Sequence, residues 1–138
     1  MEEKFTDRIK AAAASEPFAK MLEMKPLEVK EGFAKVEIQV KAEYQNLFGA
    51  THGGLIFSVL DEAFELASNS HGTFATALSV TINFLKAVKP GDKLIAEAGE
   101  VAKTKRTGNY RFLISNQDGE LVAHGQGMVY RKDDPIQI

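Results

Sequence analysis

The sequence predicts an α+β domain with one antiparallel sheet and one principal helix. Apolar residues recur with a helical period over residues 53–70 and alternate with polar ones in several other segments. Short turns join the later segments, and strands joined by short turns pair antiparallel. The chain has 138 residues, which suits a single domain, residues 1–138.

The first 25 residues are expected to form a helical segment ahead of a core at residues 27–131. Residues 2–14 are rich in alanine and place Phe5 and Ile9 on one face, which favours a helix. Ser15 is a candidate N-cap for a second short helix that reaches about residue 24, because Pro17 suits its first turn.

Strand patterns make up most of the remaining chain. Residues 27–41 contain a half-buried strand, with a turn at Glu31 and Gly32 ahead of its regular alternation. The later strands are expected at residues 74–88, 93–103, 109–116 and 121–131, which gives a sheet of five strands. Turn sequences separate them at residues 89–92, 105–108 and 117–120.

The principal helix, residues 53–70, is expected to be wrapped by other structure. Its apolar side chains fill an arc of about 200°, and Gly72 fits its C-terminal stop. Glu62 and Glu65 lie on the polar arc and are expected to form a solvated or interface face. One helix cannot cover both faces of such a sheet, so the other face should be polar or meet a partner. In the strand at residues 74–88, one face is apolar and carries Leu78, Val80, Ile82 and Phe84. The other face carries small and polar residues: Ala77, Ser79, Thr81 and Asn83.

Composition excludes several classes of function. The chain has no cysteine, which excludes cysteine nucleophiles and thiolate metal sites. The net charge of −2 does not favour nucleic-acid binding. The three histidines, His52, His71 and His124, lack metal-ligand spacing, so no metal site is predicted. No targeting or membrane segment is recognised, and a cytoplasmic protein is expected.

One group of residues has the character of a reaction site. Asn46 and the run Thr51-His52-Gly53-Gly54 precede the principal helix, and Asp61 lies on it. A helix N-terminus carries unpaired N–H groups and a partial positive charge, so it can hold a developing oxyanion. Asp61 lies about two turns further along, so it reaches the same ligand only if the ligand lies along the helix.

The segment at residues 46–61, NLFGATHGGLIFSVLD, resembles the hot-dog-fold acyl-CoA thioesterases, in particular the PaaI-like (phenylacetyl-CoA thioesterase) branch. The resemblance continues through ASNS at 67–70, INFLKAVKPGD at 82–92 and AHGQG at 123–127, and covers residues 27–131. It implies an antiparallel sheet wrapped around one long central helix. It also implies hydrolysis of a small acyl- or aryl-acyl-CoA to free acid and CoA, with no cofactor apart from the CoA of the substrate.

The resemblance also assigns roles to individual residues. Asp61 matches the catalytic carboxylate, as general base or nucleophile, and the N–H of Gly53 matches the group that polarises the thioester carbonyl. Asn46 matches a side chain that holds the carbonyl or the water. His52 and Gly54 match the loop that shapes the substrate site, and Ser79 matches a hydroxyl that a second subunit supplies. The family forms its sites across a homodimer interface and often pairs dimers into a homotetramer.

Simpler interpretations stay open beside these roles. Asp61 has the position of an ordinary solvated helix residue, Asn46 that of a turn former and His52 that of a structural histidine. Ser79 also suits a plain interface, and the two glycines also suit close helix packing. Arg106 belongs to a basic cluster with Lys103, Lys105 and Arg111 that either pairs with CoA phosphates or is simply solvated.

Two further hypotheses follow from the sequence. A like charge on Glu65, one turn beyond Asp61, would raise the pKa of Asp61. The alternative function is a non-catalytic acyl-CoA-binding or scaffolding module with the same fold.

Overall fold

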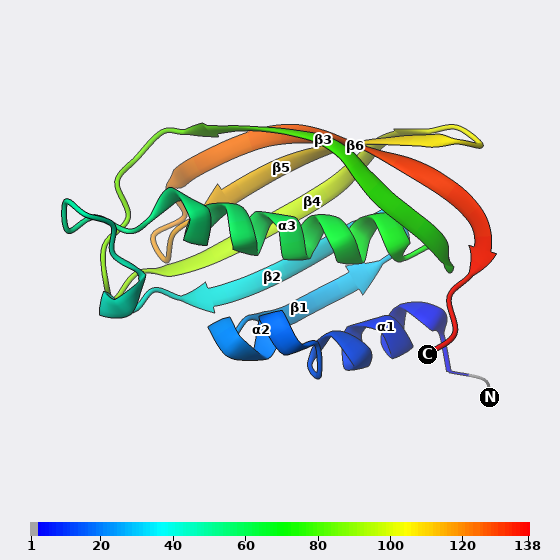
Figure 1. Ribbon diagram of the computed structural model, residues 1–138, viewed down its shortest axis with the longest axis horizontal. Coiled ribbons are helices and arrows are strands. Elements are labelled where there is room, and N and C mark those ends of the chain that lie inside the picture. Colours follow the sequence, from blue (N-terminus) through cyan, green and yellow to red (C-terminus); the bar gives the residue numbers. More distant parts are fainter. Residues whose placement is uncertain (1–2) are drawn as a thin grey trace.

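The computed structural model describes residues 3–138, and a six-stranded antiparallel sheet curves around one central helix (Figure 1). The helices are α1 (Phe5–Ala13), α2 (Pro17–Leu22), the short 3-10 helix η1 (Ala42–Tyr44) and α3 (Gly53–Asn69). The strands are β1 (Lys25–Lys30), β2 (Phe33–Gln39), β3 (Thr73–Phe84), β4 (Lys93–Lys103), β5 (Thr107–Ser115) and β6 (Leu121–Pro135). Their order in the sheet is β1-β2-β4-β5-β6-β3, so β1 and β3 are the two edges.

The predicted fold class is confirmed, whereas the predicted number of strands is wrong. The turn at Glu31 and Gly32 separates two strands, because β1 folds back and pairs with β2 in antiparallel register. Gly32 has a φ of 73°, which permits this tight reversal. The alternation in β1 is interrupted by a bulge between Pro26 and Glu28, so its pattern was too irregular to predict a separate strand.

Helix α3 fills the concave side of the sheet and packs mainly against β2 and β4. Val59, Leu60 and Phe64 of α3 are fully buried, and the Phe64 ring meets Phe112 edge-on at a centroid distance of 4.8 Å. On the convex side, Lys35 of β2 pairs with Glu97 of β4 at 3.4 Å. Polar side chains therefore occupy the uncovered face of these strands, as the sequence predicts.

Hydrogen bonds fix the C-terminal end of α3 to the sheet. Ser70 Oγ accepts a hydrogen bond from the N–H of Gly32 at 2.7 Å. The carboxylate of Glu100 accepts one from Tyr110 Oη at 2.8 Å and contacts His71 Nε2 at 2.9 Å. These bonds fix the position of α3 along its own axis relative to the sheet, and therefore the positions of its side chains.

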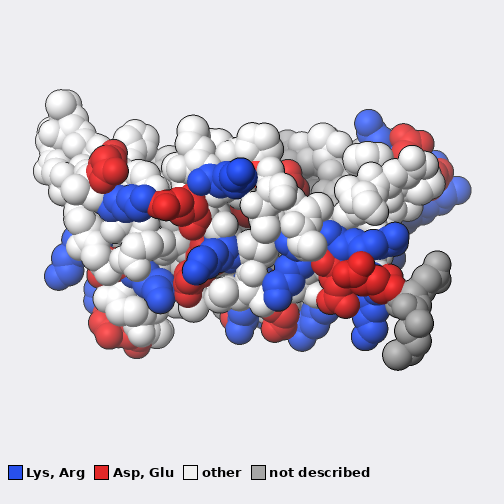
Figure 2. All heavy atoms as spheres, turned by 90° about the horizontal axis from the view of Figure 1, so that it is seen from below, with Lys and Arg blue, Asp and Glu red and all other residues white. Residues whose placement is uncertain are grey.

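The N-terminal segment covers the side of α3 that the sequence left polar. Helices α1 and α2 lie along the β1 edge, and the C-terminal end of the chain returns to lie beside α1 (Figure 1). Ser15 is not the N-cap of α2, because Glu16 takes that position and no side chain caps the helix. Viewed from this side, acidic and basic side chains are interspersed (Figure 2).

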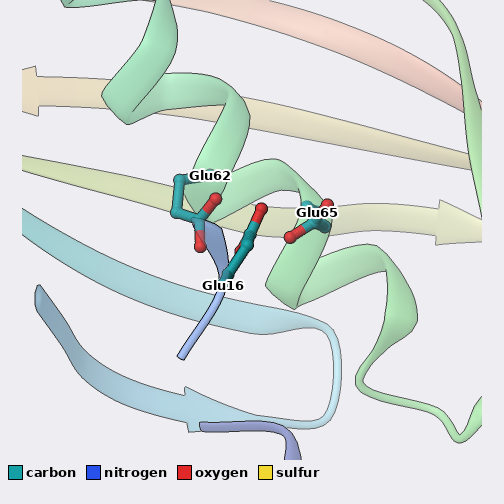
Figure 3. Close-up of side chains that lie close together, drawn as sticks. All are labelled: Glu16, Glu62 and Glu65. Carbon is teal, nitrogen blue, oxygen red and sulfur yellow. The ribbon is translucent and has the colours of Figure 1, made fainter. Parts of the chain in front are cut away.

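Glu62 departs most clearly from its predicted environment. It was expected on a solvated or interface face, but only 4% of its surface is exposed. The α1–α2 turn lies over this part of α3 and brings Glu16 against it (Figure 3). The cover comes from residues far away in the sequence, so the helical period alone did not reveal it.

The outer edge strand β3 is long and carries no charged residue. Of the side chains expected on its apolar face, Val80 and Ile82 pack against the core, whereas Leu78 and Phe84 are more than half exposed. A register shift between Ala77 and Ser79 explains part of this difference, because a bulge reverses the alternation of side chains. An unprotected edge of this kind favours pairing with another strand.

Candidate active site

The loop before α3 is closed by the side chain of Asn46. Its Oδ1 accepts hydrogen bonds from the N–H groups of Phe48 at 2.9 Å and Ala50 at 3.1 Å. This is the geometry of an Asx turn, so Asn46 does form the turn that the simpler interpretation assigns to it. Its side-chain N–H₂ group has no acceptor within residues 3–138 and is free to donate to a ligand.

His52 caps the first turn of α3. Its backbone is extended and its Nδ1 accepts the N–H of Gly54 at 2.8 Å. The N–H of Leu55 is bonded to the carbonyl of His52 at 3.0 Å. The N–H of Gly53 has no acceptor within the described part of the chain. Gly53 therefore presents a free donor at the helix N-terminus.

Gly53 lies against the end of β3. A Cβ atom added at Gly53 would come within 3.3 Å of the Phe84 ring. Gly53 and Phe84 line a hollow of about 320 Å³ together with residues of the loop before α3 and the segment after β3. The helix N-terminus is thus open on the side that faces the exposed edge strand.

Asp61 lines a different and larger cavity, of about 540 Å³. The walls of this cavity come from α1, α3, the Phe74–Ala77 part of β3 and the C-terminal residues Ile136 and Ile138. Eight residues separate Asp61 from Gly53, which amounts to about 12 Å along a helix at 1.5 Å per residue. One protomer therefore brings Asn46, His52, Gly53 and Gly54 together but leaves Asp61 apart from them.

The surroundings of Asp61 shift its acidity. Loss of hydrating water raises the pKa of the Asp61 carboxyl, and the charge of Glu16 raises it further. The sequence hypothesis named Glu65 as the like charge, and the structure replaces it with Glu16. Burial, together with hydrogen bonding and repulsion from Glu16, raises the pKa of Glu65 to about 8.

The last two predicted site residues lie elsewhere. Ser79 is exposed on the edge strand β3, at the bulge. Arg106 lies in the β4–β5 turn, at the end of the sheet opposite the N-terminus of α3 (Figure 1). Its guanidinium donates to Asp133 at 3.1 Å and to the carbonyl of Arg131 at 3.4 Å. Arg106 is therefore already paired within its own protomer.

The sequence interpretation missed two features of this region. Leu47 and Phe48 are 91% and 87% exposed at the tip of the loop that Asn46 closes. Two neighbouring apolar residues in a glycine-containing loop can be recognised in the sequence. Because large apolar side chains are usually covered, such a pair indicates a contact surface. Glu16 was the other omission, and only the tertiary fold places it beside α3.

A sheet wrapped around one helix, with a free N–H at the helix start and a carboxylate further along, defines a hot-dog protein with a candidate acyl-transfer site. The sequence model of the thioesterase superfamily matches residues 48–123. The chain belongs to this superfamily, and the predicted fold and family are confirmed.

Individual relatives agree with this assignment. The chain is 46% identical over 114 residues to a protein of Archaeoglobus fulgidus named as a candidate esterase, covering 83% of this chain and 74% of the relative. It is 40% identical to the acyl-coenzyme A thioesterase PaaI of Escherichia coli K12, covering 82% and 81% of the two chains. The solved structure of the E. coli PaaI protein superposes with a TM-score of 0.90 at 35% identity, covering 99% of this chain and all of that one.

A structure from Streptococcus mutans, described as bound to acetyl CoA, superposes with a TM-score of 0.78 at 27% identity. It covers 82% of this chain and 91% of that one. Within residues 3–138, none of the helices is both long enough and apolar enough to cross a membrane.

Proposed function

We propose that the protein hydrolyses the thioester of a small acyl- or aryl-acyl-CoA to a free acid and CoA. The observation that carries this proposal is the pair formed by the free Gly53 N–H and the Asp61 carboxylate, at separate points of one helix. The acyl-CoA thioesterase name of the E. coli relative and the acetyl CoA in the S. mutans structure support this class of substrate.

The site requires two copies of the chain. Because the two groups are about 12 Å apart along α3, the pair within one protomer cannot act on one carbonyl and its attacking water, which lie about 3–3.5 Å apart. Gly53 lies at the Phe84 end of β3, and Asp61 lines a cavity at the Phe74–Ala77 end. A two-fold axis across β3 pairs this strand antiparallel with its copy. The Gly53 of one subunit then approaches the Asp61 of the other.

The uncharged edge of β3 supports this homodimer. Ser79 lies near the middle of the strand, where a two-fold axis would bring it close to both sites. The exposed Leu47, Phe48 and Phe84 side chains lie on the loop before α3 and at the end of β3, so they add apolar surface beside the same edge. We propose that two such dimers form a homotetramer and that the protein acts in the cytoplasm.

The chemistry follows from the position of each group. The Asp61 carboxylate takes a proton from water as general base, which is typically worth about 10²–10⁴-fold in rate. The water oxygen attacks the thioester carbon, and the developing oxyanion accepts a hydrogen bond from the N–H of Gly53. The free N–H₂ group of Asn46 donates to the carbonyl or to the water. The intermediate then expels CoA as a thiolate, which leaves without strong acid assistance.

His52 acts as a positioning residue in this scheme. Its ring accepts the N–H of Gly54, so only the N–H of Gly53 faces the substrate. The peptide of Gly54 contributes to the shape of the same turn. The CoA phosphates require cationic partners, and Arg106 fills this role only by leaving Asp133.

The test is thiol release from a panel of acyl-CoAs, followed with a chromogenic thiol reagent. The chain has no cysteine, so the background is low. We expect hydrolysis by the wild type and a loss of about 10²–10⁴-fold in kcat for Asp61→Asn, with unchanged thermal unfolding. Acyl-CoA binding without any thiol release would instead identify a binding or scaffolding module. Single-turnover hydrolysis in ¹⁸O-water distinguishes a nucleophilic Asp61, which would incorporate the label, from a general base.

A further inference from the structure

A cluster of three carboxylates lies beside Asp61 and is not used by the proposed hydrolysis. Glu62 and Glu65 project from α3, and Glu16 reaches them from the turn between α1 and α2 (Figure 3). One carboxylate oxygen from each lies within 4.8 Å of the other two. These oxygens come from two segments of the chain separated by more than forty residues.

Within the part of the chain that the structure describes, no protein cation pairs with the cluster. None of the ion pairs formed within residues 3–138 includes Glu16, Glu62 or Glu65. Burial, hydrogen bonding with Glu16 and the charges of the cluster and of Asp61 together raise the pKa values of Glu62 and Glu65. Like charges this close together and partly removed from water repel strongly unless a positive charge lies between them.

Glu62 gives an independent indication of a ligand. Only 4% of its surface is exposed, so the residue is more than nine-tenths buried. Its Oε2 atom has no hydrogen-bond partner in the described structure. Its carboxylate points toward Glu16 in the interior of the cluster (Figure 3). A buried charged oxygen without a partner is costly, so it is normally found ligating an ion or paired.

We propose that Glu16, Glu62 and Glu65 bind a hard divalent cation, with Ca²⁺ the best match because it accepts carboxylate oxygens in flexible geometry. Ca²⁺ takes oxygen ligands at about 2.3–2.6 Å, so oxygens on opposite sides of the ion lie about 4.6–5.2 Å apart. The oxygens of the cluster lie within 4.8 Å of one another, so one ion of this size can contact all three. Mg²⁺ binds at about 2.0–2.1 Å and demands near-ideal octahedral geometry, whereas Ca²⁺ accepts a flexible arrangement of oxygen ligands.

The surrounding structure leaves room for the remaining ligands. Glu16 and Glu65 line the cavity of about 540 Å³ that also contains Asp61, so water can complete the coordination from this side. The bound cation would join the α1–α2 turn to α3. It would also offset the charge of Glu16 that acts on Asp61.

The experiment measures binding of Ca²⁺ alone to the full chain purified in chelator. At constant ionic strength, calorimetric titration should show one Ca²⁺ per chain. The Tm should rise by about 5–10 °C when Ca²⁺ reaches a hundredfold excess over its Kd. Mg²⁺ should give a smaller rise at the same concentration.

Variants connect the binding to the cluster. Glu62→Gln and Glu65→Gln should each remove most of the Ca²⁺-dependent rise in Tm. Glu97→Gln, which alters a partly exposed carboxylate on the other side of the sheet, should leave this rise unchanged. Both cluster variants remove repulsion, so they should fold in chelator at least as stably as the wild type.

The proposal is overturned if Ca²⁺ does not raise the Tm of the wild type, or if it raises the Tm of Glu62→Gln equally. Bound protons would then neutralise the cluster. Because the measurement needs no turnover, it is independent of whether the protein hydrolyses any acyl-CoA.

Discussion

The two-subunit site makes a prediction that a mixed dimer can test. Gly53 is the first residue of α3, where proline is well tolerated, and the extended His52 before it suits a following proline. Gly53→Pro therefore deletes one N–H group and little else. Gly53→Ala is the matched control, because it adds the Cβ contact with Phe84 but keeps the N–H.

The expected magnitudes follow from the proposed roles. Loss of one oxyanion donor costs about 2.7–4 kcal/mol, or about 10²–10³-fold in kcat. Gly53→Pro and Asp61→Asn should thus each lower the activity of a homodimer to about 1% or less. Gly53→Ala should stay within several-fold of the wild type, since the ring of Phe84 is exposed and can shift.

Two differently tagged chains are then co-expressed, and the mixed dimer is purified through both tags. In a dimer of Gly53→Pro with Asp61→Asn, a shared site restores one intact pair of groups, so about half of the wild-type activity should return. In a dimer of wild type with the double variant, neither shared site is intact and the activity should be close to zero. If each subunit held its own site, the two mixed dimers would give the opposite results, and that outcome would refute the geometric reasoning.

Two further predictions concern stability. A Cβ atom at Gly125 would lie 2.0 Å from the carbonyl oxygen of Thr81. Gly125→Ala should therefore separate β6 from β3 and lower the free energy of unfolding by about 1–3 kcal/mol or more, which denaturant titration measures. Gly99→Ala is the control and should not be destabilised, because its Cβ meets only ordinary contacts. Burial acts to raise the pKa of Glu100, but hydrogen bonds from His71 and Tyr110 outweigh it and the net pKa is lowered. The ionised Glu100 therefore stabilises the fold above the pKa of an unfolded glutamate, and this contribution is lost as the pH falls through the lower pKa of the folded state. Glu100→Gln should cost about 1–3 kcal/mol at neutral pH and progressively less in acid, as urea unfolding at several pH values would show; a difference that does not vary with pH would contradict the assignment.

The sequence was sufficient for the features that depend on neighbouring residues. The helical period of residues 53–70 and the turn residues around 89–92 and 117–120 predict elements that the structure contains. The donor at Gly53 was also predictable, because its place at the helix N-terminus follows from the glycines and His52. Local periodicity and turn chemistry decide these features, and both are readable from a single chain.

The features that the sequence did not reveal depend on segments that meet only in the folded chain. The helical wheel placed Glu62 on the polar arc, but the α1–α2 turn covers that arc. The same turn brings Glu16 to Asp61, so the charge that acts on Asp61 came from an unexpected residue. The strand β1 was missed for a related reason, since its bulge breaks the period-two pattern and only its pairing with β2 makes it a strand.

The same reasoning explains why Asp61 and the carboxylate cluster lie together. Helix α3 has to be buried on the side that faces the sheet, whereas the proposed mechanism brings the substrate to its other side near Asp61. The α1–α2 segment narrows that opening into a cavity and thereby places a third glutamate next to two others. A cation bound there would stabilise the segment that closes the cavity. Glu62→Gln should therefore remove Ca²⁺ binding from the full chain and leave the Gly53 N–H donor intact.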